Sequence, residues 1–162
     1  MRTVRRISLD GHAAIEFIAR IPHRTAMVWE AALTPEGLSS WIGETVDYEP
    51  HEGGDITLTE SDGKVTKGVI TDYAPGKRIA FATPNDEVRI LVTPIDGTTD
   101  FVLINAFANE NEAARSAATW HERVARMAKQ LDAAEPQRSW QDLYAHYVSE
   151  GFEHGATPSG NS

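Results

Sequence analysis

The chain has 162 residues and no cysteine. Disulfide bonds, thiolate nucleophiles, iron–sulfur clusters and thiolate zinc sites are therefore excluded, and nothing ties the protein to an oxidising compartment. The sequence also lacks any apolar run near the roughly 18 residues that a membrane-spanning helix needs. Its basic N-terminus is followed by Asp10, His12 and Glu16, which interrupt the apolar stretch that an export signal requires. We therefore predict a cytoplasmic location.

Positive charge is scarce. Lysine and arginine together number 15, against 24 aspartates and glutamates, which gives a net charge of −9 at pH 7. This charge repels phosphate backbones and anionic lipid, so neither nucleic acid nor a membrane is an expected partner. The six histidines show no metal-binding spacing, and the sequence contains neither a Gly-x-Ser-x-Gly elbow nor a phosphate-binding glycine loop. We predict no metal and no cofactor.

Turn dipeptides divide the middle of the chain into short β-rich runs. Asp62-Gly63 and Asp96-Gly97 favour tight hairpins, and Pro75-Gly76 and Pro84-Asn85 mark further turns. With an alternating run that ends at Ile21, they predict a seven-stranded antiparallel sheet. The six later strands are expected at residues 45–50, 55–61, 64–74, 78–83, 87–94 and 99–107.

Helical patterns precede and follow this sheet. Two short helices are expected after the first strand, over residues 24–33 and after Thr34, which is typical of an N-cap. A long amphipathic helix begins near Asn109 and ends before Pro136, and an extra C-terminal helix is expected over residues 139–150. The fold class is therefore α+β, with a curved sheet wrapped on the long helix. We predict a domain over residues 1–135, an additional helix over 136–151 packed on the domain or on a partner subunit, and a flexible tail over 152–162.

A motif with a family resemblance runs from Val28 to Leu38 (VWEAALTPEGL) and is followed by Trp41. It is similar to the opening motif of the homologues of the heat-shock protein 90 ATPase activator, within the START-like (SRPBCC) superfamily. Later landmarks match in order: Gly53-Gly54, the run from Gly68 to Pro75 with Arg78-Ile79, Asp96-Gly97-Thr98-Thr99, and Trp120. The resemblance implies a helix-grip fold with a cavity between the sheet and the long helix. Superfamily members bind hydrophobic small molecules, lipids or polyketides there, and a minority catalyse cyclisation or hydrolysis.

The hairpin at Asp96-Gly97 indicates which side chains face this cavity. Residue numbers across the hairpin sum to 193, so Val88 faces Asn105 on an otherwise apolar face. Asn105 either orients a ligand or hydrogen-bonds the helix N-terminus at residues 109–112. Asp72 is either an acid or base inside the cavity or an exposed strand residue near a turn. We expect Trp29 to belong to the core and Trp41 to close the open end of the cavity.

We therefore predict a START-like protein that binds an apolar small molecule without catalysis. The expected ligand-binding residues are Trp41, Asp72, Phe81, Ile90, Val92, Phe101, Leu103, Asn105, Ala117, Trp120 and Met127. One alternative is a cyclase or hydrolase that uses Asp72, Asn105 or His121 in the same cavity. Another is a protein-interaction or co-chaperone module that uses the sheet surface.

The opposite face of the hairpin predicts a homodimer. Leu91, Val102 and Ile104 point away from the long helix, where a solvated sheet face should be polar. The helix over residues 139–150 carries its own apolar stripe and is expected either to cover this face or to pack on a second subunit.

Overall fold

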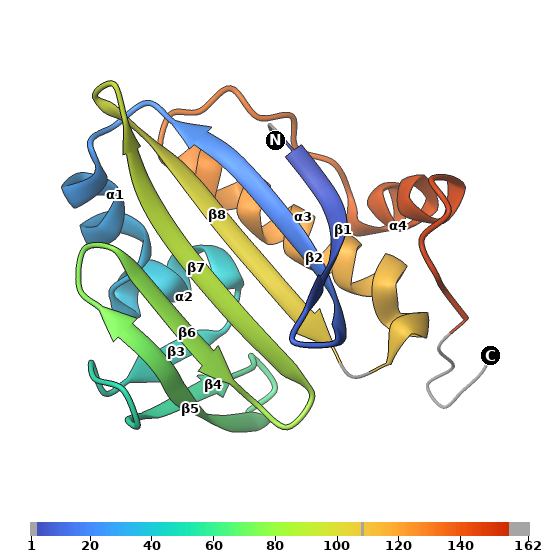
Figure 1. The fold of residues 1–162 in the computed structure, drawn as a ribbon, viewed down its shortest axis with the longest axis horizontal. Coiled ribbons are helices and arrows are strands. Elements are labelled where there is room, and N and C mark those ends of the chain that lie inside the picture. The colour runs from blue at the N-terminus through green and yellow to red at the C-terminus, as the bar shows by residue number, and fades with distance from the viewer. Residues whose placement is uncertain (1–2, 108, 156–162) are drawn as a thin grey trace.

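The computed structural model describes residues 3–107 and 109–155. This part of the chain forms one eight-stranded antiparallel sheet, with helices α1, α2 and α3 on one face (Figure 1). The strands are β1 (Thr3–Leu9), β2 (His12–Ile21), β3 (Thr45–Tyr48), β4 (Asp55–Thr59), β5 (Val65–Ala74), β6 (Arg78–Ala82), β7 (Asp86–Ile95) and β8 (Thr98–Phe107). They lie in the order β1-β2-β8-β7-β6-β5-β4-β3. The predicted α+β class and the meander from β3 to β8 are confirmed.

One strand more is present than the seven predicted. The additional strand, β1, pairs with β2 along its whole length, from Thr3 opposite Ile18 to Leu9 opposite His12. The turn between them has positive φ at both central residues, 52° at Asp10 and 82° at Gly11, as does the predicted turn at Asp96 (47°) and Gly97 (80°). This conformation is that of a tight hairpin turn, which Asp-Gly favours. The same dipeptide therefore signalled a strand before residue 10.

Two short helices follow β2, as predicted: α1 (Thr25–Ala32) and α2 (Pro35–Ile42). Thr34 caps α2, because its Oγ1 accepts a hydrogen bond from the Gly37 backbone N–H at 3.1 Å. Gly37 allows the two helices to meet, since a Cβ at this position would lie 2.6 Å from the carbonyl oxygen of Ala31. This close approach places Trp41 of α2 beneath the end of α1.

The core lies between the sheet and α3 (Ala113–Gln130), which follows the 3₁₀ turn η1 (Glu110–Glu112). The predicted register of β7 and β8 is confirmed, with Val88 opposite Asn105, Ile90 opposite Leu103 and Val92 opposite Phe101. The helix α3 packs on β2 and β8 and buries the small residues Ala114, Ala117 and Ala118. Small residues on the helix thus allow it to lie close to the sheet.

The last helix, α4 (Trp140–Ser149), packs on α3 within the same chain. The Trp140 Nε1–H donates to Thr119 Oγ1 at 2.9 Å, and Leu143 and Tyr147 are buried in the contact. Figure 1 shows α4 beyond the edge strand β1, away from the outer face of the sheet. The prediction that this helix covers Leu91, Val102 and Ile104 is therefore wrong. A short linker cannot carry it around the sheet, and α3 offers an apolar flank nearby.

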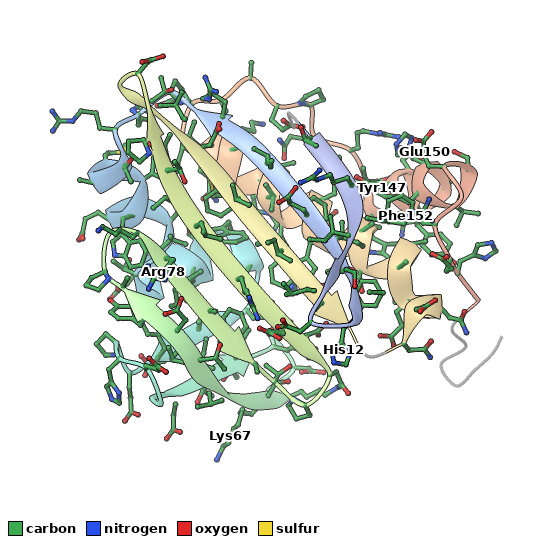
Figure 2. All side chains as sticks on the ribbon, in the orientation of Figure 1. His12, Lys67, Arg78, Tyr147, Glu150 and Phe152 are labelled. Carbon is green, nitrogen blue, oxygen red and sulfur yellow. The ribbon has the colours of Figure 1, made fainter. Side chains whose placement is uncertain are left out.

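The packed part of the chain also continues past residue 151. Phe152 is only 7% exposed and lies beside Tyr147, with the Arg6 guanidinium 4.8 Å from its ring centre (Figure 2). The carbonyl of Glu153 accepts a hydrogen bond from the Ala114 N–H at 2.9 Å, which satisfies a donor in the first turn of α3. A flexible tail therefore does not begin at residue 152, and residues 156–162 of the predicted tail lie outside the described residues. None of the helices in the described part combines the length and the apolar character that a membrane crossing requires.

Candidate functional site: a cavity under the long helix

A cavity of about 430 Å³ lies between the N-terminal half of α3 and strands β4 to β7. Its lining residues come from both layers: Glu44, Leu58, Thr66, Phe81, Thr83, Asn85, Asp86, Val88, Glu112, Arg115, Ser116, Thr119, Trp120 and Arg123. Leu58, Phe81 and Val88 form the apolar side of the sheet wall, where Phe81 and Val88 are direct neighbours on β6 and β7. Trp120 supplies apolar surface from the helix. The cavity is thus a mostly polar space with an apolar patch formed by Leu58, Phe81, Val88 and Trp120.

Asp86, the first residue of β7, is the central polar group of the sheet wall. Its Oδ1 accepts a hydrogen bond from Asn105 Nδ2 at 3.2 Å, and the same amide nitrogen lies 3.4 Å from the Glu87 carbonyl oxygen. Burial raises the pKa of the Asp86 carboxyl, while the Asn105 hydrogen bond and the Arg123 charge act in the opposite direction. Asp86 therefore carries a partly desolvated carboxyl into the cavity.

Asn105 lies directly behind Asp86 and is fully buried, with 0% exposure. Its nitrogen faces Asp86 and Glu87, and its Oδ1 has no hydrogen-bond partner among the described residues. Leaving a buried acceptor unsatisfied costs about 1–3 kcal/mol. The predicted alternative, a bond to the helix N-terminus, is not formed, because Asn109 itself caps that turn by accepting from the Asn111 N–H.

Arg123 forms the helix side of the polar cluster. Its Nη2 lies 3.1 Å from Glu44 Oε2, both side chains are only 19% exposed, and its guanidinium lies 4.6 Å from the centre of the Trp120 ring. Burial lowers the pKa of Arg123, which the opposite charge of Glu44 partly offsets. The arginine is therefore fixed by an ion pair and an aromatic ring at the cavity wall.

Two of the predicted ligand-binding residues, Phe81 and Trp120, line this cavity. Seven others fill the core instead and do not line it: Trp41, Ile90, Val92, Phe101, Leu103, Ala117 and Met127. Trp41 is not a gate, because it is fully buried, donates its Nε1–H to the Ala32 carbonyl at 2.9 Å, and packs edge-on against Phe101 and Trp120. Trp29 belongs to the core, as predicted.

Asp72 lies on the opposite side of the sheet. A β-bulge between Ile70 and Asp72 shifts the register of β5, so that Asp72 pairs with Ala80 and faces outward. Its Oδ2 accepts from Arg78 Nε at 2.6 Å, and both side chains are more than 40% exposed. Figure 2 labels Arg78 at the start of β6 on this outer face. The hypothesis that Asp72 is an acid or base in the cavity is therefore wrong.

His121, the other candidate for acid–base chemistry, lies on the flank of α3 that faces α4. Its Nδ1 is 2.6 Å from the Tyr147 hydroxyl. Burial lowers the pKa of His121 to about 4 and raises that of Tyr147, so the phenol donates and the neutral imidazole accepts. Among the described residues, no group of three or more histidine, aspartate or glutamate side chains is arranged to hold a metal ion.

Sequence reasoning missed Asp86, Arg123 and Glu44. The pairing rule that placed Asn105 inward also pairs Asp86 with Phe107, so the same rule could have predicted that Asp86 faces inward. Arg123 follows Trp120 by three residues and therefore shares its helix face. Glu44 follows the left-handed Gly43 that ends α2, and no pattern in the sequence indicated its direction.

A curved antiparallel sheet, a long C-terminal helix held against it and a cavity between the two define a helix-grip protein of the START-like class. The family model described as "Activator of Hsp90 ATPase homolog 1-like protein" matches residues 23–134. The chain belongs to this family, and the predicted resemblance is confirmed.

Solved structures share the fold at low sequence identity. A conserved protein of unknown function from Enterococcus faecalis has a TM-score of 0.74 and 15% identity, over 91% of this chain and 89% of that one. CalU16 from Micromonospora echinospora has a TM-score of 0.71 and 18% identity, over 92% and 96% of the two chains. DynU16, from the dynemicin biosynthetic locus, has a TM-score of 0.66 and 21% identity, over 78% of this chain and 49% of that one. No curated protein matches the sequence.

Proposed function

We propose that this protein binds a small molecule in the cavity between α3 and the sheet. The observation that carries the proposal is the cavity itself, whose volume of about 430 Å³ lies within the range of small-ligand sites, about 300–1,000 Å³. Such sites combine apolar walls with a few fixed polar groups. Here Phe81, Val88 and Trp120 form an apolar patch, and Asp86 and Arg123 are fixed polar groups in a lining that is otherwise mostly polar.

The lining refines the expected ligand. The sequence predicted an apolar molecule, but only four residues of this lining are apolar, and the others are polar or charged. An amphipathic molecule fits such a lining better, because a purely apolar one would desolvate Asp86 and Arg123 without replacing their hydrogen bonds. We therefore propose a ligand with a flat apolar body and a polar edge.

Binding of the neutral, environment-sensitive dye Nile red tests this proposal. Ser116 lines the cavity from α3, so Ser116→Trp should fill it and weaken dye binding about tenfold or more, equivalent to about 1.4 kcal/mol. Lys129→Trp is the matched control, since Lys129 is exposed near the end of the same helix and does not line the cavity. Equal dye binding by the two variants would contradict the proposal.

Acid–base catalysis in the same cavity is a second candidate, and Asp86 favours it. A carboxyl whose pKa is raised by burial and whose orientation is fixed by Asn105 is suited to proton transfer. A cyclase or hydrolase would then use Asp86 in place of Asp72. The test is native mass spectrometry of the protein from its own host: a co-purified compound that the wild type converts and Asp86→Asn retains unchanged supports catalysis. A compound that both proteins retain supports binding alone.

We propose the cytoplasm as the location, on the absence of cysteine.

We propose a second copy of the chain as a partner on the outer sheet face. There Ile18, Val102 and Leu91 form a continuous apolar row across β2, β8 and β7. Ion pairs such as Arg20–Asp100 and Arg78–Asp72 flank this row, so much of the face's charge is already neutralised within each copy.

A further inference from the structure

We propose that the cavity selects neutral or cationic aromatic molecules that donate hydrogen bonds, such as phenols and amines, and rejects carboxylates and phosphates. This inference rests on the proposed function and deepens it by naming the class of ligand. It follows from the polar groups that the cavity offers.

The sheet wall offers hydrogen-bond acceptors. The Asp86 carboxyl accepts from Asn105 through Oδ1, and a carboxylate has room for several further donors. Asn105 does not line the cavity, but its amide holds Asp86 Oδ1 from behind and so fixes the carboxyl in the wall. A ligand hydroxyl or ammonium group can donate to the remaining acceptor positions of Asp86, whereas a ligand carboxylate adds another acceptor.

The two arginines of the cavity do not make it favourable for an anionic ligand. Arg123 is held by Glu44 at 3.1 Å and by the face of Trp120, so its charge is already balanced by a half-buried carboxylate. Arg115 is exposed at the rim, where water screens it. The lining therefore holds three carboxyl side chains, Glu44, Asp86 and Glu112, against two guanidinium groups. Its formal charge is −1 if all five ionise, in a chain whose net charge is −9.

The apolar side favours a flat aromatic body. Phe81 and Val88 stand side by side on neighbouring strands, and Trp120 faces the same space from α3. Aromatic rings gain contact area and favourable edge or stacking geometry against such residues. Each of these side chains is at most 6% exposed, so together they present a narrow apolar patch beside Asp86, which suits a thin ring system with a donor at its edge.

Three probes with one ring system test the inference: 2-naphthol, 2-naphthylmethylamine and 2-naphthoate. Their affinities are measured by calorimetry with the full chain at pH 7.5, beside Nile red as the reference for cavity binding. We expect the naphthol and the amine to bind and the naphthoate to bind about tenfold more weakly or worse, because like charges in a partly desolvated site repel strongly. In Asp86→Asn, which keeps the shape and removes the charge, the difference between naphthol and naphthoate should shrink severalfold. Asp72→Asn is the matched control, since it removes a carboxylate on the outer face, and should keep the wild-type preference.

The outcomes separate the two proposals. Naphthoate binding as tightly as naphthol to the wild type overturns the inference, and so does a preference that Asp86→Asn leaves unchanged. If Nile red binds in the cavity and neither donor probe does, the inference fails while the proposed function stands. If Ser116→Trp leaves Nile red binding intact, the proposed function itself fails. The comparison of probes on the wild type decides the inference even if Asp86→Asn does not fold.

Discussion

Replacement of Trp41 by alanine distinguishes a core residue from a gate over the cavity. Trp41 is fully buried between α1, β8 and α3, in edge-on contact with Phe101 and Trp120. Removal of a buried Trp side chain costs about 3–5 kcal/mol. The change also removes the 2.9 Å hydrogen bond from Nε1 to the Ala32 carbonyl, and the cost of this lost bond is included in this figure of about 3–5 kcal/mol. Because a domain is stable by only about 5–15 kcal/mol, Trp41→Ala should remove a large share of the total.

Equilibrium unfolding in urea measures this change. Trp41→Phe separates the two contributions, because it keeps an aromatic ring in the core but deletes the donor to Ala32, and we expect an intermediate loss of about 1–3 kcal/mol. Met27→Ala serves as the control on α1, since Met27 is 44% exposed, and should change the free energy of unfolding by less than about 0.5 kcal/mol. A loss of stability below about 1 kcal/mol in Trp41→Ala, together with weaker Nile red binding, would refute the core assignment and support the hypothesis that Trp41 closes the cavity.

Three further predictions concern the flanks of the molecule. Because burial lowers the pKa of His121 from 6.5 to about 4, the unfolded chain binds more protons between these values, and stability should fall as the pH drops through this window. In His121→Gln the urea midpoint should depend less on pH there, and an unchanged slope would assign the effect to other groups. Asp72→Asn breaks only an exposed ion pair, so it should cost less than about 1 kcal/mol and leave Nile red affinity intact; loss of dye binding would return Asp72 to the cavity. The double variant Leu91→Lys and Val102→Glu should abolish self-association in sedimentation equilibrium, and a wild-type species of 17.8 kDa at all micromolar concentrations would disprove the dimer.

Most of the fold could be predicted from hydrophobic periodicity and from the residues that favour turns and helix caps. The meander from β3 to β8, the tandem helices α1 and α2, and the long helix α3 were predictable because each has a strong local signal, such as the Thr34 cap or the turn at Asp96-Gly97. β1 was missed because its arginines obscure the alternation of apolar and polar residues. The dipeptide Asp10-Gly11, which favours a tight hairpin turn, did indicate a strand before it.

The site was harder to predict because one extra residue in a strand reverses every side chain beyond it. Ile70 faces the core, so strict alternation would point Asp72 inward as well. The bulge after Ile70 instead turns Asp72 outward and packs the partly buried Tyr73 against the core, where its ring contacts those of Trp29 and Tyr48. No residue in this stretch marks the bulge in the sequence. The position of the cavity likewise depends on how closely α3 approaches each strand, which is a property of the packed layers and not of any local pattern.

The C-terminal segment after α3 changes what counts as the unit of folding. The family match ends at residue 134, yet the hydrogen-bonding partners of several α3 groups come from beyond it: Trp140 for Thr119, Tyr147 for His121 and the Glu153 carbonyl for the Ala114 N–H. A chain cut at the family boundary would expose the apolar flank of α3 and leave these groups to water. Helix α3 forms one wall of the cavity. The segment after residue 134, which lies outside the family match, therefore packs on this wall and supports it. Relatives that lack this segment would have to stiffen that wall by other means or tolerate a more mobile one.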